Sequence, residues 1–433
     1  MMNNRETATN QIIENNYNDA KGNLTGVIKA IVSNRIDIRK DITDTEIREL
    51  ITSVVFEKSQ QVYLSIKEKQ EIVESVFNSM RRMGILQPLI DDHLVTEIMI
   101  NGPDNIFIEK GGSVHKLDIK LENEEKLEDI IQSVVSKANR VVNEASPIVD
   151  ARLQDGSRVN VVLKPIALNG PVMTIRKFPS EPVTMNKLIE LGSITPKGAE
   201  FLKYLVKAKY NIFVCGGAGS GKTTFLNALS GFISEDERII TIEDSAELQI
   251  TGISNLVRLE TRNENMEGKG RVSVKDLIKT SLRMRPERII VGEVRGDEAL
   301  DMLQAMNTGH DGSLSTGHGN SPRDMLNRLE TMVLGAAPLP LQAIRQQIAS
   351  AIEIIVHLSR MRDKSRKTLE ITEVAGFKEG EIVLNPLFEF EDEGDTEGQT
   401  VKGSLKRTGN EMIRKMKFKQ AGVWKQGDDS LEA

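Results

Sequence analysis

The stretch of sequence that decides the fold runs from Asn211 to Leu229 and reads "NIFVCGGAGSGKTTFLNAL". It begins with a β-branched and aromatic run typical of a buried strand and ends in an apolar pattern typical of a helix. Between them stands Gly216-x-x-x-x-Gly221-Lys222-Thr223, the P-loop pattern. Glycines in this position let backbone N–H groups curl around a phosphate at the positive end of the helix. The stretch therefore predicts binding of a nucleoside triphosphate.

Each part of this loop has an expected role. Lys222 supplies a positive charge for the β- and γ-phosphates, and the Thr223 hydroxyl joins the coordination shell of Mg²⁺. The residues expected to contact the nucleotide are Gly216, Gly217, Ala218, Gly219, Ser220, Gly221, Lys222, Thr223 and Thr224.

Two further strands carry acids where they end. "RIITIED" (Arg238 to Asp244) and "RIIVGE" (Arg288 to Glu293) have the composition of buried strands. The carboxyl ends of parallel strands lie at the edge of the sheet where ligands bind. We therefore expect one carboxylate to hold Mg²⁺ and the other to activate the attacking water, without a choice between them. The Asp usual before such a glutamate is absent, since Gly292 precedes Glu293.

An arginine-bearing segment lies between the acidic strands. "VRLETRNENMEGKG" contains Arg258 and Arg262. Such arginines can neutralise a transferred phosphoryl group, and in a ring a neighbouring subunit can deliver them. The alternative is a solvated basic loop of no catalytic importance.

Two of the five histidines stand in a glycine-rich stretch, "TGHDGSLSTGHGN" (Thr308 to Asn320). Their spacing does not fit the usual zinc pairs, and Asp311 is the only close carboxylate. Ser313 and Ser315 offer little support for a nucleophile–base pair. The remaining alternatives are a γ-phosphate sensor, whose glycines allow movement after hydrolysis, and a surface loop with inert histidines.

Composition narrows the class of protein. The 433 residues are 39% hydrophobic and 28% charged, with a net charge of −6 and one cysteine, Cys215. These values are typical of a globular protein of two or three domains and exclude an intramolecular disulfide. No apolar run is long enough for a membrane helix, and the polar N-terminus predicts a cytosolic chain. The acidic balance argues against indiscriminate nucleic-acid binding.

Periodicity and composition divide the chain into six parts. We expect a disordered or loosely helical N-terminus over 1–40, a helical region over 41–90 and an α+β domain over 91–178. A linker over 179–190, a P-loop domain over 191–390 and a charged tail over 391–433 follow.

The four elements of the P-loop domain resemble, in their order, the Walker A, Asp box, Walker B and His box of the type II/type IV secretion ATPase superfamily. "ITIEDSAEL" is similar to the Asp box, and "IIVGEVRGDEAL" with the histidine stretch to the last two. Upstream, "VTEIMINGPDNIFIEKGG" is similar to the N-terminal domain of that family. The amino-acid sequence of these stretches is most similar to the CpaF/TadA branch, which serves tight-adherence (Flp) pilus assembly.

The resemblance implies a RecA-like P-loop domain with a parallel-rich sheet, preceded by a smaller α+β domain and a helical region. It implies an ATPase that uses ATP and Mg²⁺ in a homohexameric ring, with movement between the two domains. The ring would dock on a platform protein at the inner face of the cytoplasmic membrane, without a transmembrane segment of its own, and nucleic acid would not be its partner.

Site residues carry over position by position. Glu243 and Glu293 would share Mg²⁺ and water activation, and Arg258 and Arg262 would act as arginine fingers. The remaining matches contact or approach the nucleotide: His318 facing the phosphate, His310 as its structural partner, and the N-terminal-domain arginines Arg158 and Arg176.

Two departures from the family pattern bear on function. Gly317 and Gly319 flank His318 where the branch has a bulky aliphatic residue and alanine, which predicts a looser loop. A single cysteine cannot form the four-cysteine zinc module of some relatives.

Two other functions stay open at this point. A nucleic-acid motor would use the basic stretches "RMRDKSRKT" (Arg360 to Thr368) and "LKRTGNEMIRKMKFK" (Leu405 to Lys419), although neither interleaves aromatic residues. We expect the first of them to form the tip of a hairpin. A nucleotide-gated scaffold with little turnover would explain the altered His box.

Overall fold

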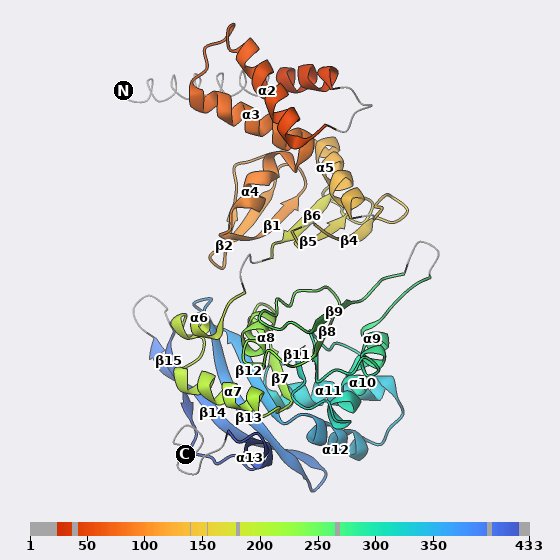
Figure 1. The fold of residues 1–433 in the computed structure, drawn as a ribbon, viewed down its shortest axis with the longest axis vertical. Helices are drawn as coiled ribbons and strands as arrows, with labels where there is room; N and C mark the ends of the chain where they lie inside the picture. The colour runs from red at the N-terminus through yellow and green to blue at the C-terminus, as the bar shows by residue number, and fades with distance from the viewer. Residues whose placement is uncertain are drawn as a thin grey trace. The chain divides into compact units, whose positions relative to one another are not determined.

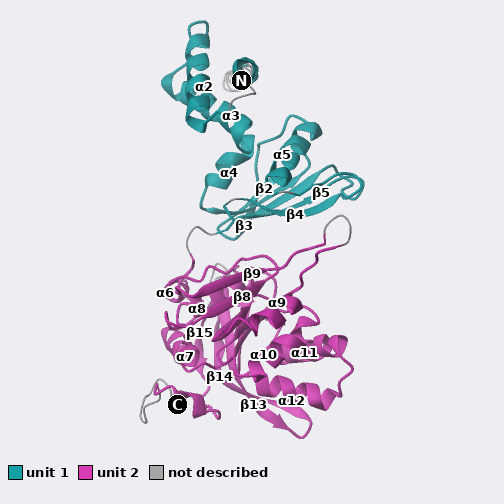
Figure 2. Ribbon diagram, turned by 45° about the vertical axis from the view of Figure 1, so that its right-hand side comes forward, with its two compact units in different colours: residues 1–180 teal, residues 181–433 magenta. Residues whose placement is uncertain are grey.

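The computed structural model describes residues 24–36, 42–138, 140–153, 155–178, 182–264, 269–395 and 401–423. The chain forms two compact units, residues 1–180 and 181–433 (Figure 2). The division falls inside the predicted linker. That linker is shorter than the predicted 179–190, because Met185–Glu190 forms helix α6. Met185 and Leu188 bury their side chains in the core of the second unit, so this helix belongs to that unit.

The first unit begins with helices that share one core. Helix α2 (Asp44–Lys58) and helix α3 (Ile66–Arg81) pack together, with a 3₁₀ turn over Gly84–Leu86 and helix α4 (Gln87–Asp91) after them. Ser65 and Glu68 form a capping box at the start of α3. Residues 24–35 are also helical and bury Ile28 in the same core. The rest of the predicted loosely helical N-terminus, residues 1–23 and 37–40, lies outside the described residues.

The remainder of the first unit is a six-stranded antiparallel sheet with helix α5 (Glu124–Lys137) (Figure 1). Its order is β3-β2-β1-β6-β5-β4. Strands β1 (Val95–Asn101) and β2 (Ile106–Lys110) form a hairpin with antiparallel pairing. The other strands are β3 (Ser113–Lys116), β4 (Ile148–Arg152), β5 (Arg158–Val162) and β6 (Val172–Arg176).

The second unit is built on a nine-stranded sheet in the order β15-β14-β13-β12-β7-β11-β10-β8-β9. The six strands from β12 to β9 pair in parallel, and β13, β14 and β15 continue antiparallel. The predicted RecA-like class with a parallel-rich sheet is confirmed. The strands are β7 (Ile212–Gly216), β8 (Ile239–Glu243), β9 (Leu256–Glu260), β10 (Arg288–Val291), β11 (Leu314–His318), β12 (Ile354–Arg360), β13 (Arg366–Lys378), β14 (Glu381–Asp395) and β15 (Val401–Arg407).

Helices cover both faces of this sheet (Figure 1). The core on one face includes side chains of α6, α7 (Pro196–Lys207), α8 (Lys222–Ser230) and α13 (Met416–Gln420). The core on the other includes α9 (Val274–Ser281), α10 (Glu298–Asn307), α11 (Pro322–Ala336) and α12 (Leu341–Ala351). Because the central strands are buried on both faces, they read as continuous apolar runs rather than alternating ones.

The charged C-terminal tail predicted over 391–433 is wrong for its described part. Strand β15 pairs with β14, and Met412 and Phe418 are buried. The buried Glu373 carboxylate accepts backbone N–H groups of Ile413 and Arg414, which fixes the segment after β15. Composition misled here because a few buried positions are enough to anchor a mostly polar segment.

None of the helices in the described parts of the chain combines the length and the apolar character that a bilayer crossing requires.

Candidate nucleotide site at the carboxyl edge of the sheet

The P-loop lies between the end of β7 and the start of α8, as its sequence predicts. Gly216 has no alternative here, because a Cβ atom would lie 2.4 Å from the Leu358 carbonyl oxygen. Gly221 has φ +91°, which a side chain would strain. The Lys222 Nζ donates to the carbonyls of Gly216 and Gly217 at 3.1 and 3.0 Å. The predicted phosphate-contacting residues therefore gather in one turn.

The two acidic strand ends meet at the same edge as this loop. Strand β8 ends at Glu243, and Glu293 follows β10, its parallel neighbour, by two residues. The Oε2 of Glu243 accepts backbone N–H groups of Glu247 and Leu248 at 2.6 and 2.9 Å. Its Oε1 is buried and finds no hydrogen-bond partner among the described residues. Burial raises the pKa of Glu243 to about 7, even though these two hydrogen bonds oppose the shift.

The structure gives a reason for glycine before Glu293. A Cβ atom on Gly292 would lie 2.9 Å from the Cγ of Glu243. A side chain at this position would displace the Glu243 carboxylate. The usual Asp is therefore absent for a structural reason, because Gly292 leaves room for the buried side chain of Glu243.

Glu293 lies among cationic and imidazole groups. Its Oε2 accepts from Nε and Nη2 of Arg295 at 2.9 and 2.6 Å. Its Oε1 lies 2.8 Å from Nε2 of His318, in ion-pair range but without a well-directed N–H···O geometry. The other ring nitrogen, Nδ1, is 3.5 Å from the Nζ of Lys222. His318 thus links the Walker B glutamate to the P-loop lysine.

Desolvation and the charge of Lys222 lower the pKa of His318, and the Glu293 carboxylate only partly offsets them. At neutral pH the imidazole is therefore mainly uncharged. A neutral ring can donate from one nitrogen and accept at the other.

The histidine stretch is a surface loop only in its first part, where Thr308, Gly309 and Asp311 are exposed. Leu314–His318 is strand β11, which lies between β7 and β10 in the middle of the sheet. The expectation that Gly317 and Gly319 loosen the stretch is wrong. Cβ atoms there would lie 3.0 Å from Met325 atoms, so the Met325 side chain fills this space. His318 is held by strand pairing opposite Gly216.

The structure does not bring His310 to this site. It lies before the amino end of β11, on the opposite edge of the sheet from His318. Its Nδ1 is 3.2 Å from the Ala305 carbonyl oxygen, and its own carbonyl accepts from the Ser313 hydroxyl. His310 therefore has a structural role in this unit, and its assignment as a nucleotide contact is not supported.

The four predicted arginines fall into different places. Arg258, on the edge strand β9, donates to the Leu248 carbonyl at 3.0 Å, in the segment that also binds the Glu243 carboxylate. Arg262 is exposed and donates to the Gly270 carbonyl. Arg158 and Arg176 belong to the first unit, where they are directly opposed on β5 and β6. Of these four predicted arginines, Arg258 is the one that approaches the acids within the second unit.

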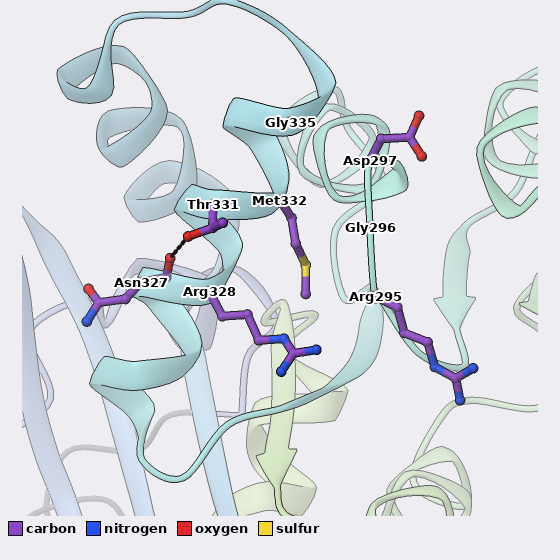
Figure 3. Close-up of a pocket in the computed structure, with 8 residues that line it drawn as sticks. All are labelled: Arg295, Gly296, Asp297, Asn327, Arg328, Thr331, Met332 and Gly335. Carbon is purple, nitrogen blue, oxygen red and sulfur yellow. Dashed lines mark hydrogen bonds between the residues drawn. The ribbon is translucent and has the colours of Figure 1, made fainter.

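Two further arginines near this site, Arg295 and Arg328, were not predicted from the sequence. Both line an open pocket of about 650 Å³ beside the Walker B segment (Figure 3). Arg295 contacts Glu293, and Arg328 contributes to the lowered pKa of His318. The position of Arg295 two residues after Glu293 was the available signal, whereas Arg328 on α11 gave none.

A divalent cation fits this edge only in part. In the portion of the chain that the structure describes, no three His, Cys, Asp or Glu side chains gather closely enough to hold a metal ion. Mg²⁺ commonly binds through one or two carboxylates completed by phosphate oxygens and water. The buried and unpartnered Oε1 of Glu243 and the partly exposed side chain of Glu293 match that mode.

Comparison with known proteins identifies the family of the chain. Residues 79–407 match the family described as Type II/IV secretion system protein, and the chain therefore belongs to that family. A Mycobacterium tuberculosis protein assigned provisionally to conjugal transfer is 36% identical over 66% of this chain and 83% of its own length. The conjugal transfer protein TrbB of Rhizobium radiobacter is 32% identical over 67% of this chain and 86% of its own.

Among solved structures, the VirB11 ATPase of the Brucella suis type IV secretion system is 28% identical. It aligns over 66% of this chain and 94% of that chain, with a TM-score of 0.36.

Proposed function

We propose that this chain is an ATP-hydrolysing motor of a type II/IV secretion or pilus-assembly machine. The observation that carries the proposal is the convergence of Lys222, His318 and Glu293 through contacts of 3.5 and 2.8 Å at the carboxyl edge of the sheet. A phosphate held by the P-loop would have its terminal group facing these side chains.

The two glutamates receive different roles in this proposal. Glu293 is the general base, because its carboxylate reaches the edge of the sheet and lies against a neutral His318. Glu243 is the orienting acid, since one oxygen is committed to backbone N–H groups. Thr223 and Glu243 would hold Mg²⁺, and Glu293 would contact it through a water molecule. The ion would supply neutralisation of the charge on the transferred phosphoryl group.

The ring and its arginines are part of the same proposal. Arg258 and Arg262 on the β9 side would act on the nucleotide of a neighbouring copy, and Arg158 and Arg176 would approach the nucleotide from the first unit. Their support is the motif resemblance together with their places on an edge strand and in one cross-strand pair. The expected assembly is a homohexamer.

The biological setting is proposed from the same motifs. The similarity of these motifs to the CpaF/TadA branch favours Tad (Flp) pilus assembly, with a cytoplasmic ring docked on a membrane platform protein. If this is right, the neighbouring genes encode prepilin-like and multi-spanning membrane proteins. A neighbourhood of conjugation genes alone would redirect the assignment to that branch.

Phosphate release by the purified chain tests the enzymatic proposal. We expect steady turnover of Mg-ATP that Lys222→Ala abolishes, since the substitution removes the charge on the β- and γ-phosphates. ATP binding without turnover in the assembled ring would replace the motor by the scaffold. Stimulation by DNA with a steep salt dependence would instead favour the nucleic-acid motor.

A further inference from the structure

The hairpin between β12 and β13 lies beside the P-loop, on the side away from the acids. Strand β12 pairs in parallel with β7 as far as Leu358 opposite Gly216, and it then runs two residues further to Arg360. The sequence predicts a hairpin here, and the hairpin is confirmed. Its place next to the phosphate loop is not evident from the sequence.

Two arginines of this hairpin reach the loop. The Nε of Arg366 donates to the Gly219 carbonyl oxygen at 3.3 Å. One Nη of Arg360 lies 3.8 Å from the Cβ position of Gly219, and the Cγ of Arg366 lies 3.8 Å from that of Gly221. Arg360 shares a face of β12 with Leu358, which packs in the same core as α8. Both arginines are exposed on the P-loop side.

The pairing of these arginines points to a ligand. Arg360 and Arg366 are directly opposed across the two strands. Like charges in this relation destabilise a strand pair. Arg362, in the same turn, has an ion pair with Asp392 at 3.5 Å. Two opposed cations at the rim of a phosphate loop therefore suit an anionic or electron-rich ligand.

The strand order indicates which part of a nucleotide they would meet. The acids and His318 lie on the β11-β10-β8 side of β7, and they define the end that takes the γ-phosphate. The hairpin lies on the β12 side. A nucleotide whose phosphates occupy the P-loop therefore extends its nucleoside end towards the hairpin.

We propose that Arg360 and Arg366 bind the nucleoside end of the nucleotide, through the ribose, the α-phosphate and the face of the base. This inference rests on the proposed function, because it takes the P-loop ligand to be a nucleotide. Guanidinium groups suit the task, since they stack on aromatic faces and donate to oxygen acceptors in a fixed plane. Arg366 also braces the loop through Gly219, whereas Arg360 tests the ligand contact apart from that brace.

The contact is the same before and after hydrolysis, because the nucleoside end does not react. Arg360→Ala and Arg366→Ala should therefore weaken ADP and ATP by a similar factor, about tenfold each, as for loss of a charge-assisted contact. The KM for ATP should rise by that factor while kcat stays within about twofold. Substitutions of the acids should do the opposite.

Isothermal titration of the full chain with ADP and with ATP measures this effect, alongside phosphate release at saturating ATP. Arg362→Ala is the matched control, since it removes one charge from the same turn, and its affinity should equal that of the wild type. Circular dichroism melting establishes that each variant is folded. Wild-type ADP affinity in Arg360→Ala, or loss of ring assembly with affinity retained, would overturn the inference. No binding of ADP by the wild type would instead remove the proposed function.

Discussion

The two edges of the nine-stranded sheet use charge in opposite ways. At the amino edge, Arg288 is fully buried and donates to Glu237 twice and to the carbonyls of Val206 and Gly312. At the carboxyl edge, Glu243 keeps one buried oxygen without a partner among the described residues. Buried charge is tolerated for stability only when it is fully satisfied. A buried carboxyl oxygen without a partner at the other edge therefore indicates a ligand-binding site.

The largest effect should come from Glu293→Gln, which changes a side chain at the carboxyl edge of the sheet and leaves the amino edge intact. Loss of the general base should lower kcat by about 10³-fold, on the order of 4 kcal/mol of transition-state stabilisation. ATP affinity and the melting temperature should change little, because the amide keeps the shape of the side chain. Phosphate release under saturating ATP measures the effect. A kcat near that of the wild type would show that Glu293 is not the base.

Arg288→Met should have the next largest effect, because it removes the buried guanidinium at the amino edge of the sheet and leaves the carboxyl edge intact. Among the described residues, it leaves the buried Glu237 carboxylate with Lys209, at 3.3 Å, as its ion-pair partner. The free energy of unfolding should therefore fall by about 3 kcal/mol. Below the melting temperature, kcat should remain within about twofold of the wild-type value. Urea unfolding measures the loss, and the double variant Arg288→Met/Glu237→Leu should recover much of it. An equal loss in the double variant would contradict the ion-pair explanation.

The pH dependence of stability separates the edges further. Glu243 has a pKa near 7 in the folded chain, against an ordinary value of 4.5, so folding takes up a proton between these values. Stability from this group is therefore full below about pH 4.5 and is lost as the pH rises through about 7, on the order of 3 kcal/mol. Glu243→Gln should remove this part of the slope in urea-unfolding midpoints. An unchanged slope would place the titration elsewhere.

The smallest effect compares the two histidines. His318→Gln should lower kcat by about tenfold, on the order of 1.4 kcal/mol, because His318 contacts both Glu293 and Lys222. His310→Gln is the matched control at the amino edge, and it should leave kcat unchanged. Phosphate release by the two variants in parallel gives the comparison. Equal losses of kcat would contradict the structural role of His310 and show that it also acts on the nucleotide.

Local sequence patterns predicted the strands and the loop that carry this site. The remaining features depend on contacts between residues far apart in the sequence. The P-loop and the acidic strand ends follow from residues close in sequence, so β7, β8 and β10 could be read directly. The space that Met325 fills beside Gly317, and the room that Gly292 leaves for Glu243, depend on how separate elements pack. The contact of Arg366 with Gly219 joins residues 147 positions apart. No periodicity or composition records such contacts.

The C-terminal strand has a practical consequence for anyone who shortens this chain. Its charge suggests a dispensable extension, and a truncation after residue 390 would look harmless. It would remove β15 and leave the backbone groups of β14 open along the new border of the sheet. Such borders recruit strands from other molecules. It would also strip Phe418 from its contact with Tyr210, so the product should aggregate during expression rather than yield a smaller working protein.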